Sequence, residues 1–136
     1  MEEIYVATGK VRFIYHHMAF IGEESIRAAE ATECAGEQGA LWRYMDTLFA
    51  NQHGENQGAF ADQYLKAFAS EMGLDQLKFN TCLDSRRYRT AVLQETQEGR
   101  ARGVQSTPSF FINGELIKGL LPFEGFKEKI DAALGG

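Results

Sequence analysis

The chain has 136 residues and a formal net charge of −5 at pH 7, and 44% of its residues are hydrophobic. This length and apolar content predict a single domain with a packed core and exclude a disordered chain. The acidic balance gives no electrostatic footprint for nucleic acid, so we expect no nucleic-acid partner.

No apolar run in the sequence approaches the roughly 18–20 residues that a membrane-spanning helix needs, so we expect no membrane partner. The first residues, Met1-Glu2-Glu3, are acidic and lack the basic and then apolar segments of a secretory signal. On these features we expect the protein to stay in the cytoplasm, where it is made.

The first predicted element is a strand over residues 11–16, which are β-branched and aromatic and follow a Gly9-Lys10 turn. Between about residues 23 and 103 no strand is predicted, and helical periodicity takes over. Two apolar stripes mark this region: Leu41, Met45, Leu48 and Phe49 with Trp42, then Phe60, Tyr64, Phe68 and Met72. Gly73 suits the end of the second stripe's helix, and Asp75 suits the N-cap of the next helix.

The pattern of period two returns after Gly103. Residues 109–112 are predicted to form a strand, Asn113-Gly114 a hairpin turn and residues 115–118 the returning strand. Pro122 suits the first turn of a last helix. The inner face of this helix is predicted to hold Phe123, Phe126, Ile130 and Leu134. The order of elements indicates an α/β or α+β protein with an all-helical middle.

The Thr107-Pro108 pair precedes the aromatic strand. Alone, it indicates an ordinary trans proline, because cis bonds are only about 5–6% of X-Pro bonds in folded proteins. Four segments in this order change the interpretation: residues 8–13, 28–42, 82–88 and 107–114. Together they make the chain similar to the DsbA-like thiol-disulfide oxidoreductases, a thioredoxin-fold family with a helical insertion.

The resemblance implies a thioredoxin-like α/β fold in one domain, residues 1–136, with the helical insertion at about residues 23–103. It implies that Thr107 and Pro108 bind substrate, namely an extended segment of a thiol-containing protein or peptide. Neither a cofactor nor a metal is expected. Against the family pattern, the first, central strand and most of the first helix are missing, so we expect an N-terminally truncated member.

The family's Cys-x-x-Cys motif is absent from this sequence, whose two cysteines, Cys34 and Cys82, lie far apart. Without a thiolate paired with a resolving cysteine, dithiol exchange has no nucleophile, so this chain alone is predicted to be inactive. The alternative is a redox-dead thioredoxin-like module that binds peptides or its own copies. A glutathione-using or isomerase branch is a weaker third alternative, because no other nucleophile is evident.

A missing central strand would leave two unpaired sheet edges. The remaining strands could pair directly, or another polypeptide could fill the gap. We favour association between copies, since exposed aromatic edges invite pairing, and therefore expect a homo-oligomer.

Cys34 and Cys82 lie on apolar helical faces, which indicates two buried thiols. The resemblance implies an alternative, a structural disulfide between them. Neither is at redox-motif spacing, so no catalytic role is expected. His16 and His17 would point to opposite faces of a strand and could not share a metal. His53 is predicted to be solvated in a polar loop.

Overall fold

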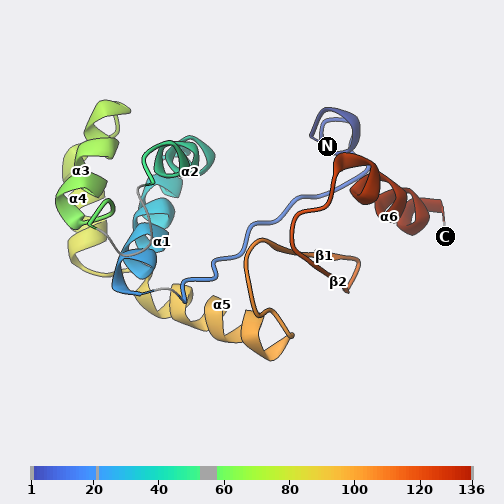
Figure 1. The fold of residues 1–136 in the computed structure, drawn as a ribbon. Helices are drawn as coiled ribbons and strands as arrows, with labels where there is room; N and C mark the ends of the chain where they lie inside the picture. The colour runs from blue at the N-terminus through green and yellow to red at the C-terminus, as the bar shows by residue number, and fades with distance from the viewer. Residues whose placement is uncertain (1, 21, 53–57, 136) are drawn as a thin grey trace. The chain divides into compact units, whose positions relative to one another are not determined.

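The computed structural model describes residues 2–20, 22–52 and 58–135 (Figure 1). The elements are η1 (Glu2–Val6, a short π-helix), α1 (Glu23–Gly36), α2 (Leu41–Ala50), α3 (Asp62–Glu71), α4 (Gln76–Asp84), α5 (Arg89–Ala101), β1 (Ser109–Ile112), β2 (Glu115–Lys118) and α6 (Phe123–Gly135). They fall into two compact units, one of residues 1–16 and 98–136 and one of residues 17–97. No helix in the described ranges is long and apolar enough to cross a membrane.

The unit of residues 17–97 is helical, and α1 is its central element. Helix α1 contacts α2, α3 and α4, and small residues on α1 let these helices approach closely. The core beneath them includes Ala31, Ala35, Tyr44, Leu65, Ala69, Phe79 and Leu83. The Tyr44 hydroxyl, buried in this core, donates a hydrogen bond of 2.8 Å to the Leu65 carbonyl. This bond satisfies a polar atom that would otherwise be costly to bury.

The ends of α3 and α4 follow the local signals in the sequence. Gly73 has a φ of 77°, the left-handed conformation that ends many helices, and the Leu74 N–H donates to the Ala69 carbonyl over 3.1 Å. Asp75 caps α4, since its side chain accepts a hydrogen bond of 3.1 Å from the Lys78 N–H. Both predicted helix boundaries are confirmed.

The predicted inner faces of two helices were partly wrong. In α3 the fully buried residues are Leu65 and Ala69, whereas Tyr64 is 47% exposed. The other members of the predicted stripe, Phe60, Phe68 and Met72, are partly buried and pack against the core, so Tyr64 alone departs from the prediction. On α2, Tyr44, Met45 and Leu48 are buried, but Trp42 is 50% exposed.

The other unit contains a two-stranded antiparallel sheet in which Ser109 pairs with Lys118 and Ile112 with Glu115. Asn113 and Gly114 have φ values of 47° and 89°, as a tight hairpin turn requires, so the predicted hairpin is confirmed. Helix α6 packs on β1, where the Phe110 and Phe126 rings meet edge to face at 4.8 Å. Of the predicted inner face of α6, Ile130 is buried, whereas Phe123 and Leu134 are exposed.

The strand predicted at residues 11–16 does not form. Residues 11–20 belong to no helix or strand, and the sheet of the described residues consists of β1 and β2. A strand is defined by backbone pairing, and no described segment pairs with residues 11–16. Large apolar side chains are therefore exposed there, including Ile14 at 56%.

Candidate functional site

The loop that carries Thr107 and Pro108 begins where α5 ends. Gly103 has a φ of 91°, and the Val104 N–H donates to the Gly99 carbonyl over 2.9 Å, so the last turn of the helix is closed by glycine. The chain then runs to β1, where the Ser109 hydroxyl donates to the Ser106 carbonyl over 2.6 Å. These bonds fix both ends of the loop.

The Thr107–Pro108 peptide bond is cis, and both side chains are exposed. The Pro108 carbonyl accepts a hydrogen bond of 3.0 Å from the Gly119 N–H, which extends the pairing of β1 with β2 by one residue. In an antiparallel pair, residues with main-chain groups toward the partner alternate with residues whose groups point away. The main-chain hydrogen-bonding groups of Pro108, Phe110 and Ile112 therefore point toward β2 in this pairing.

Ser109 and Phe111 consequently present their main-chain N–H and C=O groups on the outer edge of β1, away from β2. Within the described part of the chain, no backbone group pairs with this edge. The Phe111 side chain is 41% exposed. An open, short strand edge beside two exposed residues can accept an extended peptide as an added strand.

The N-terminal turn is attached to α6 in the same unit. The Tyr5 hydroxyl donates to Asp131 Oδ1 over 2.6 Å, and Lys127 Nζ donates to Asp131 Oδ2 over 2.8 Å. The hydrogen bonds from Lys127 and Tyr5 lower the pKa of the Asp131 carboxyl, and the bond to Asp131 raises the pKa of the Tyr5 hydroxyl. The contact is thus strongest when Asp131 is ionised.

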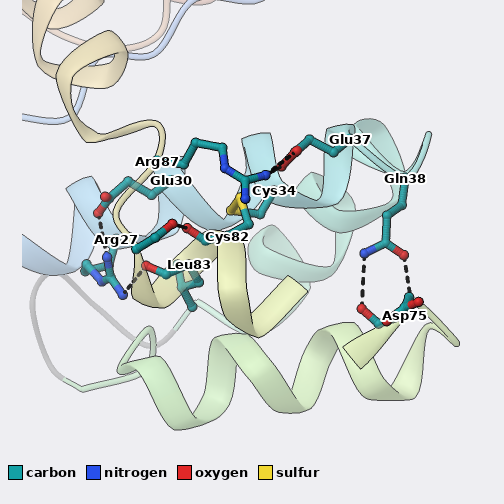
Figure 2. The surroundings of a disulfide bond; sticks show 10 residues. Arg27, Glu30, Cys34, Glu37, Gln38, Asp75, Cys82, Leu83 and Arg87 are labelled. Atoms are coloured by element: carbon teal, nitrogen blue, oxygen red, sulfur yellow. Dashed lines mark hydrogen bonds and ion pairs between the residues drawn. A yellow bond between two sulfur atoms is a disulfide. The ribbon is translucent and has the colours of Figure 1, made fainter. Parts of the chain in front are cut away.

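Cys34 of α1 and Cys82 of α4 form a disulfide with an S–S distance of 2.08 Å and a Cα–Cα distance of 5.8 Å (Figure 2). Each cysteine is only 1% exposed. The structure therefore brings the two cysteines together as a disulfide and does not have them as two buried thiols. Both belong to the helical unit, and the unit that holds Thr107 and Pro108 contains no cysteine.

A buried ionic network that was not predicted from the sequence lies near the disulfide. Arg27 donates to Glu30 Oε2 over 3.0 Å and to the Leu83 carbonyl over 3.1 Å (Figure 2). It also donates to both Asp62 carboxylate oxygens, over 2.8 and 2.9 Å. The hydrogen bond from Arg27 lowers the pKa of Asp62, and the bonds that Arg27 donates to Asp62 and Glu30 raise the pKa of Arg27. The sequence feature that could have predicted this network is the spacing of Arg27 and Glu30, three residues apart among alanines on one helix.

Neither described histidine lies in a metal site. His16 is exposed, whereas His17 is 5% exposed, and its Nε2 lies 2.8 Å from Glu33 Oε1. The His17 N–H donates to Glu95 Oε2 over 2.7 Å. The described residues contain no group of three or more ligating side chains suited to a metal. His53 lies outside the described residues.

A family model described as thioredoxin matches residues 1–132, and the chain belongs to this family. The structure resembles that of oxidised BdbD from Bacillus subtilis with a TM-score of 0.87, at 22% identity, over 99% of this chain and 75% of that one. The predicted fold, a thioredoxin-like fold with many helices as in DsbA-like proteins, is confirmed.

Curated relatives are longer than this chain. The chain is 26% identical over 138 residues to a probable disulfide bond formation protein D of Bacillus cereus, covering 98% of this chain and 63% of that protein. It is 32% identical over 109 residues to a Na⁺/H⁺ antiporter NhaA of Herminiimonas arsenicoxydans, covering 80% of this chain and 17% of the antiporter. The chain thus spans less than two thirds of either relative.

Proposed function

We propose that this chain is the peptide-binding part of a DsbA-like thiol-disulfide oxidoreductase, and that it does not catalyse dithiol exchange by itself. An extended segment of a thiol-containing protein adds to the outer edge of β1, next to Thr107 and Pro108. The main-chain groups of Ser109 and Phe111 supply the hydrogen bonds, so binding depends little on the sequence of the peptide.

The open outer edge of β1 carries this proposal. Main-chain groups that point away from β2 are satisfied by water in the free protein and by a peptide backbone in the complex. The names of the Bacillus relatives describe disulfide bond formation, which supports a thiol-containing protein as the ligand.

The inactivity rests on the sequence and on the state of the cysteines. No Cys-x-x-Cys is present, and both cysteines are consumed in one disulfide within the helical unit. Dithiol exchange needs a thiolate that attacks and a second thiol that resolves the mixed disulfide. Redox catalysis by this family would therefore require a cysteine pair from another polypeptide segment.

Self-association is the second candidate, and the exposed apolar residues at 11–16 favour it. Phe13, Ile14 and Tyr15 are 39%, 56% and 38% exposed. Two copies would pair these segments and cover the apolar side chains, giving a homo-oligomer. Sedimentation should then show a dimer or larger species, and a stable monomer at high concentration would refute this candidate.

The cytoplasmic location stays a prediction.

The peptide-binding proposal is tested by one pair of proline variants. Phe111 and Leu116 are directly opposite in the sheet, and each directs its N–H away from the other strand. Phe111→Pro removes a donor from the outer edge of β1, and Leu116→Pro removes the matching donor from the outer edge of β2. We expect Phe111→Pro to weaken binding of a fluorescent cysteine-containing peptide by about tenfold, and Leu116→Pro to change it little.

Circular dichroism shows whether both proline variants fold. Equal loss of binding in the two variants, or no loss in Phe111→Pro, would contradict the site. An insulin-reduction assay tests the second half of the proposal, since turnover by the isolated chain would contradict its inactivity.

A further inference from the structure

A groove of about 660 Å³ lies beside the disulfide on the helical unit. Its walls include Cys34 and Glu37, Leu77, Lys78 and Thr81 of α4, and Arg87. Of the two disulfide-bonded cysteines, Cys34 lines the groove and Cys82 does not. A volume of this size suits a small molecule.

An ion pair joins two of the residues that line the groove. Arg87 donates through one guanidinium nitrogen to both carboxylate oxygens of Glu37, over 2.6 and 2.7 Å (Figure 2). The Arg87 N–H also donates to the Cys82 carbonyl over 3.4 Å, which holds the start of this side chain next to the disulfide. The Arg87 and Glu37 side chains are 48% and 32% exposed, and exposed ion pairs of this kind open at little cost.

The charges of the groove favour an anion. Lys78 and Arg87 are cationic, and Glu37 is the one carboxylate of the lining residues. Within the described part of the chain, Lys78 Nζ forms no ion pair. The anionic group of a ligand can therefore bind Lys78 directly and displace Glu37 from Arg87. Leu77, which is 77% exposed, can contact an apolar part of the same ligand.

We propose that this groove is a thiol-exchange site, in which a small anionic thiol binds and opens the Cys34–Cys82 disulfide by attack on Cys34. The thiolate sulfur of the ligand forms a new S–S bond with Cys34 Sγ, the Cys34–Cys82 bond breaks, and its electron pair leaves with Cys82 as a thiolate. A second ligand thiolate then attacks the ligand sulfur of the mixed disulfide. This step releases the ligand disulfide and leaves both cysteines reduced.

Cys34 and Cys82 are both 1% exposed, so the surroundings of each cysteine decide which sulfur is attacked. Cys34 and Cys82 each lie two residues before the end of their helix, so the helix dipoles disfavour a thiolate equally at both positions. Only Cys34 borders the groove and its cations. The inference concerns the helical unit and does not depend on peptide binding at β1.

The first test compares Cys34→Ser with Cys82→Ser, which lose the same disulfide and each retain one thiol. Both are treated with oxidised glutathione, and the rate of mixed-disulfide formation is followed by mass spectrometry. We expect Cys34, in the Cys82→Ser variant, to react at least about tenfold faster than Cys82 in the Cys34→Ser variant. Equal rates, faster reaction of Cys82, or no reaction of Cys34 would overturn the proposal.

The second test uses the intact disulfide and therefore does not depend on the folding of those variants. Its reduction is timed with 2-mercaptoethanesulfonate and with uncharged 2-mercaptoethanol at equal thiolate concentration and low salt. We expect the anionic thiol to react about twofold to fivefold faster, and Lys78→Gln to abolish this preference. Lys66→Gln, a control outside the groove that loses an ion pair to Asp84, should retain it. Equal reduction rates with the two thiols in the unmodified protein, or an unchanged rate ratio in Lys78→Gln, would overturn the proposal.

Discussion

At the scale of residues, one buried cation organises several acids. Arg27 is 6% exposed, and it holds Glu30, which is 1% exposed, together with the more accessible Asp62. Glu30 Oε1 is buried and has no hydrogen-bond partner among the described residues, whereas Oε2 accepts a hydrogen bond from Arg27. Asp62 stabilises the folded chain beside Arg27 when its carboxyl is ionised, because the Arg27 hydrogen bond lowers its pKa.

Acid should therefore weaken the fold through Asp62. The Arg27 hydrogen bond lowers the pKa of Asp62 below its ordinary value of 3.8 in the folded state, so the stabilisation is present above that value and is lost as the pH falls below it. We expect the free energy of unfolding, measured in urea between pH 2 and pH 7, to decrease below about pH 4. Asp62→Asn should be less stable at pH 7 and should show a shallower decrease in acid. An unchanged pH dependence would argue against this role.

At the scale of elements, Arg27 joins three helices, because it extends from α1 to Asp62 at the start of α3 and to the Leu83 carbonyl in α4. The disulfide joins α1 to α4 at a second point. Helix α1 thus packs its alanine-rich face against the other helices and is fixed to them by both polar and covalent contacts. Removing the Arg27 charge is costly, because its buried acidic partner then loses its nearest cation.

Arg27→Met should lower the free energy of unfolding by about 3–5 kcal/mol, because Glu30 is then buried with only the more distant Arg89 as a cation, 3.6 Å away. The double variant Arg27→Met, Glu30→Met should recover a large part of this loss, since no buried charge is left unpaired. Arg43→Ala, an exposed control on α2, should change stability by less than about 0.5 kcal/mol. Chemical denaturation of the four proteins checks these values, and a double variant no better than the single one would refute the explanation.

Local signals predicted those elements that local chemistry specifies. Asp75, Gly73 and Asn113-Gly114 act through their own backbone or cap geometry, and the structure has each as predicted. Residues 11–16 were predicted as a strand from composition, but a strand needs a partner that their own sequence does not supply. The Arg27 network was missed for the same kind of reason, because Asp62 and Leu83 meet Arg27 only in the folded unit.

At the scale of the whole molecule, the two units carry different chemistry. The unit with α6 holds Thr107, Pro108 and the open edge of β1, and the helical unit holds every cysteine and the buried ionic network. The family could be predicted because its motifs lie in a characteristic order along the chain. The roles of Thr107 and Pro108 could not be derived from the dipeptide itself, since an exposed Thr-Pro pair also occurs in ordinary loops.

Amide hydrogen exchange of β1, measured by NMR with and without a saturating cysteine-containing peptide, tests peptide binding most directly. The peptide should slow exchange at Ser109 and Phe111, whose N–H groups lie on the outer edge. It should leave Phe110 and Ile112 nearly unchanged, because these residues face β2. Unchanged exchange at Ser109 and Phe111, with the peptide bound, would contradict strand addition at this edge.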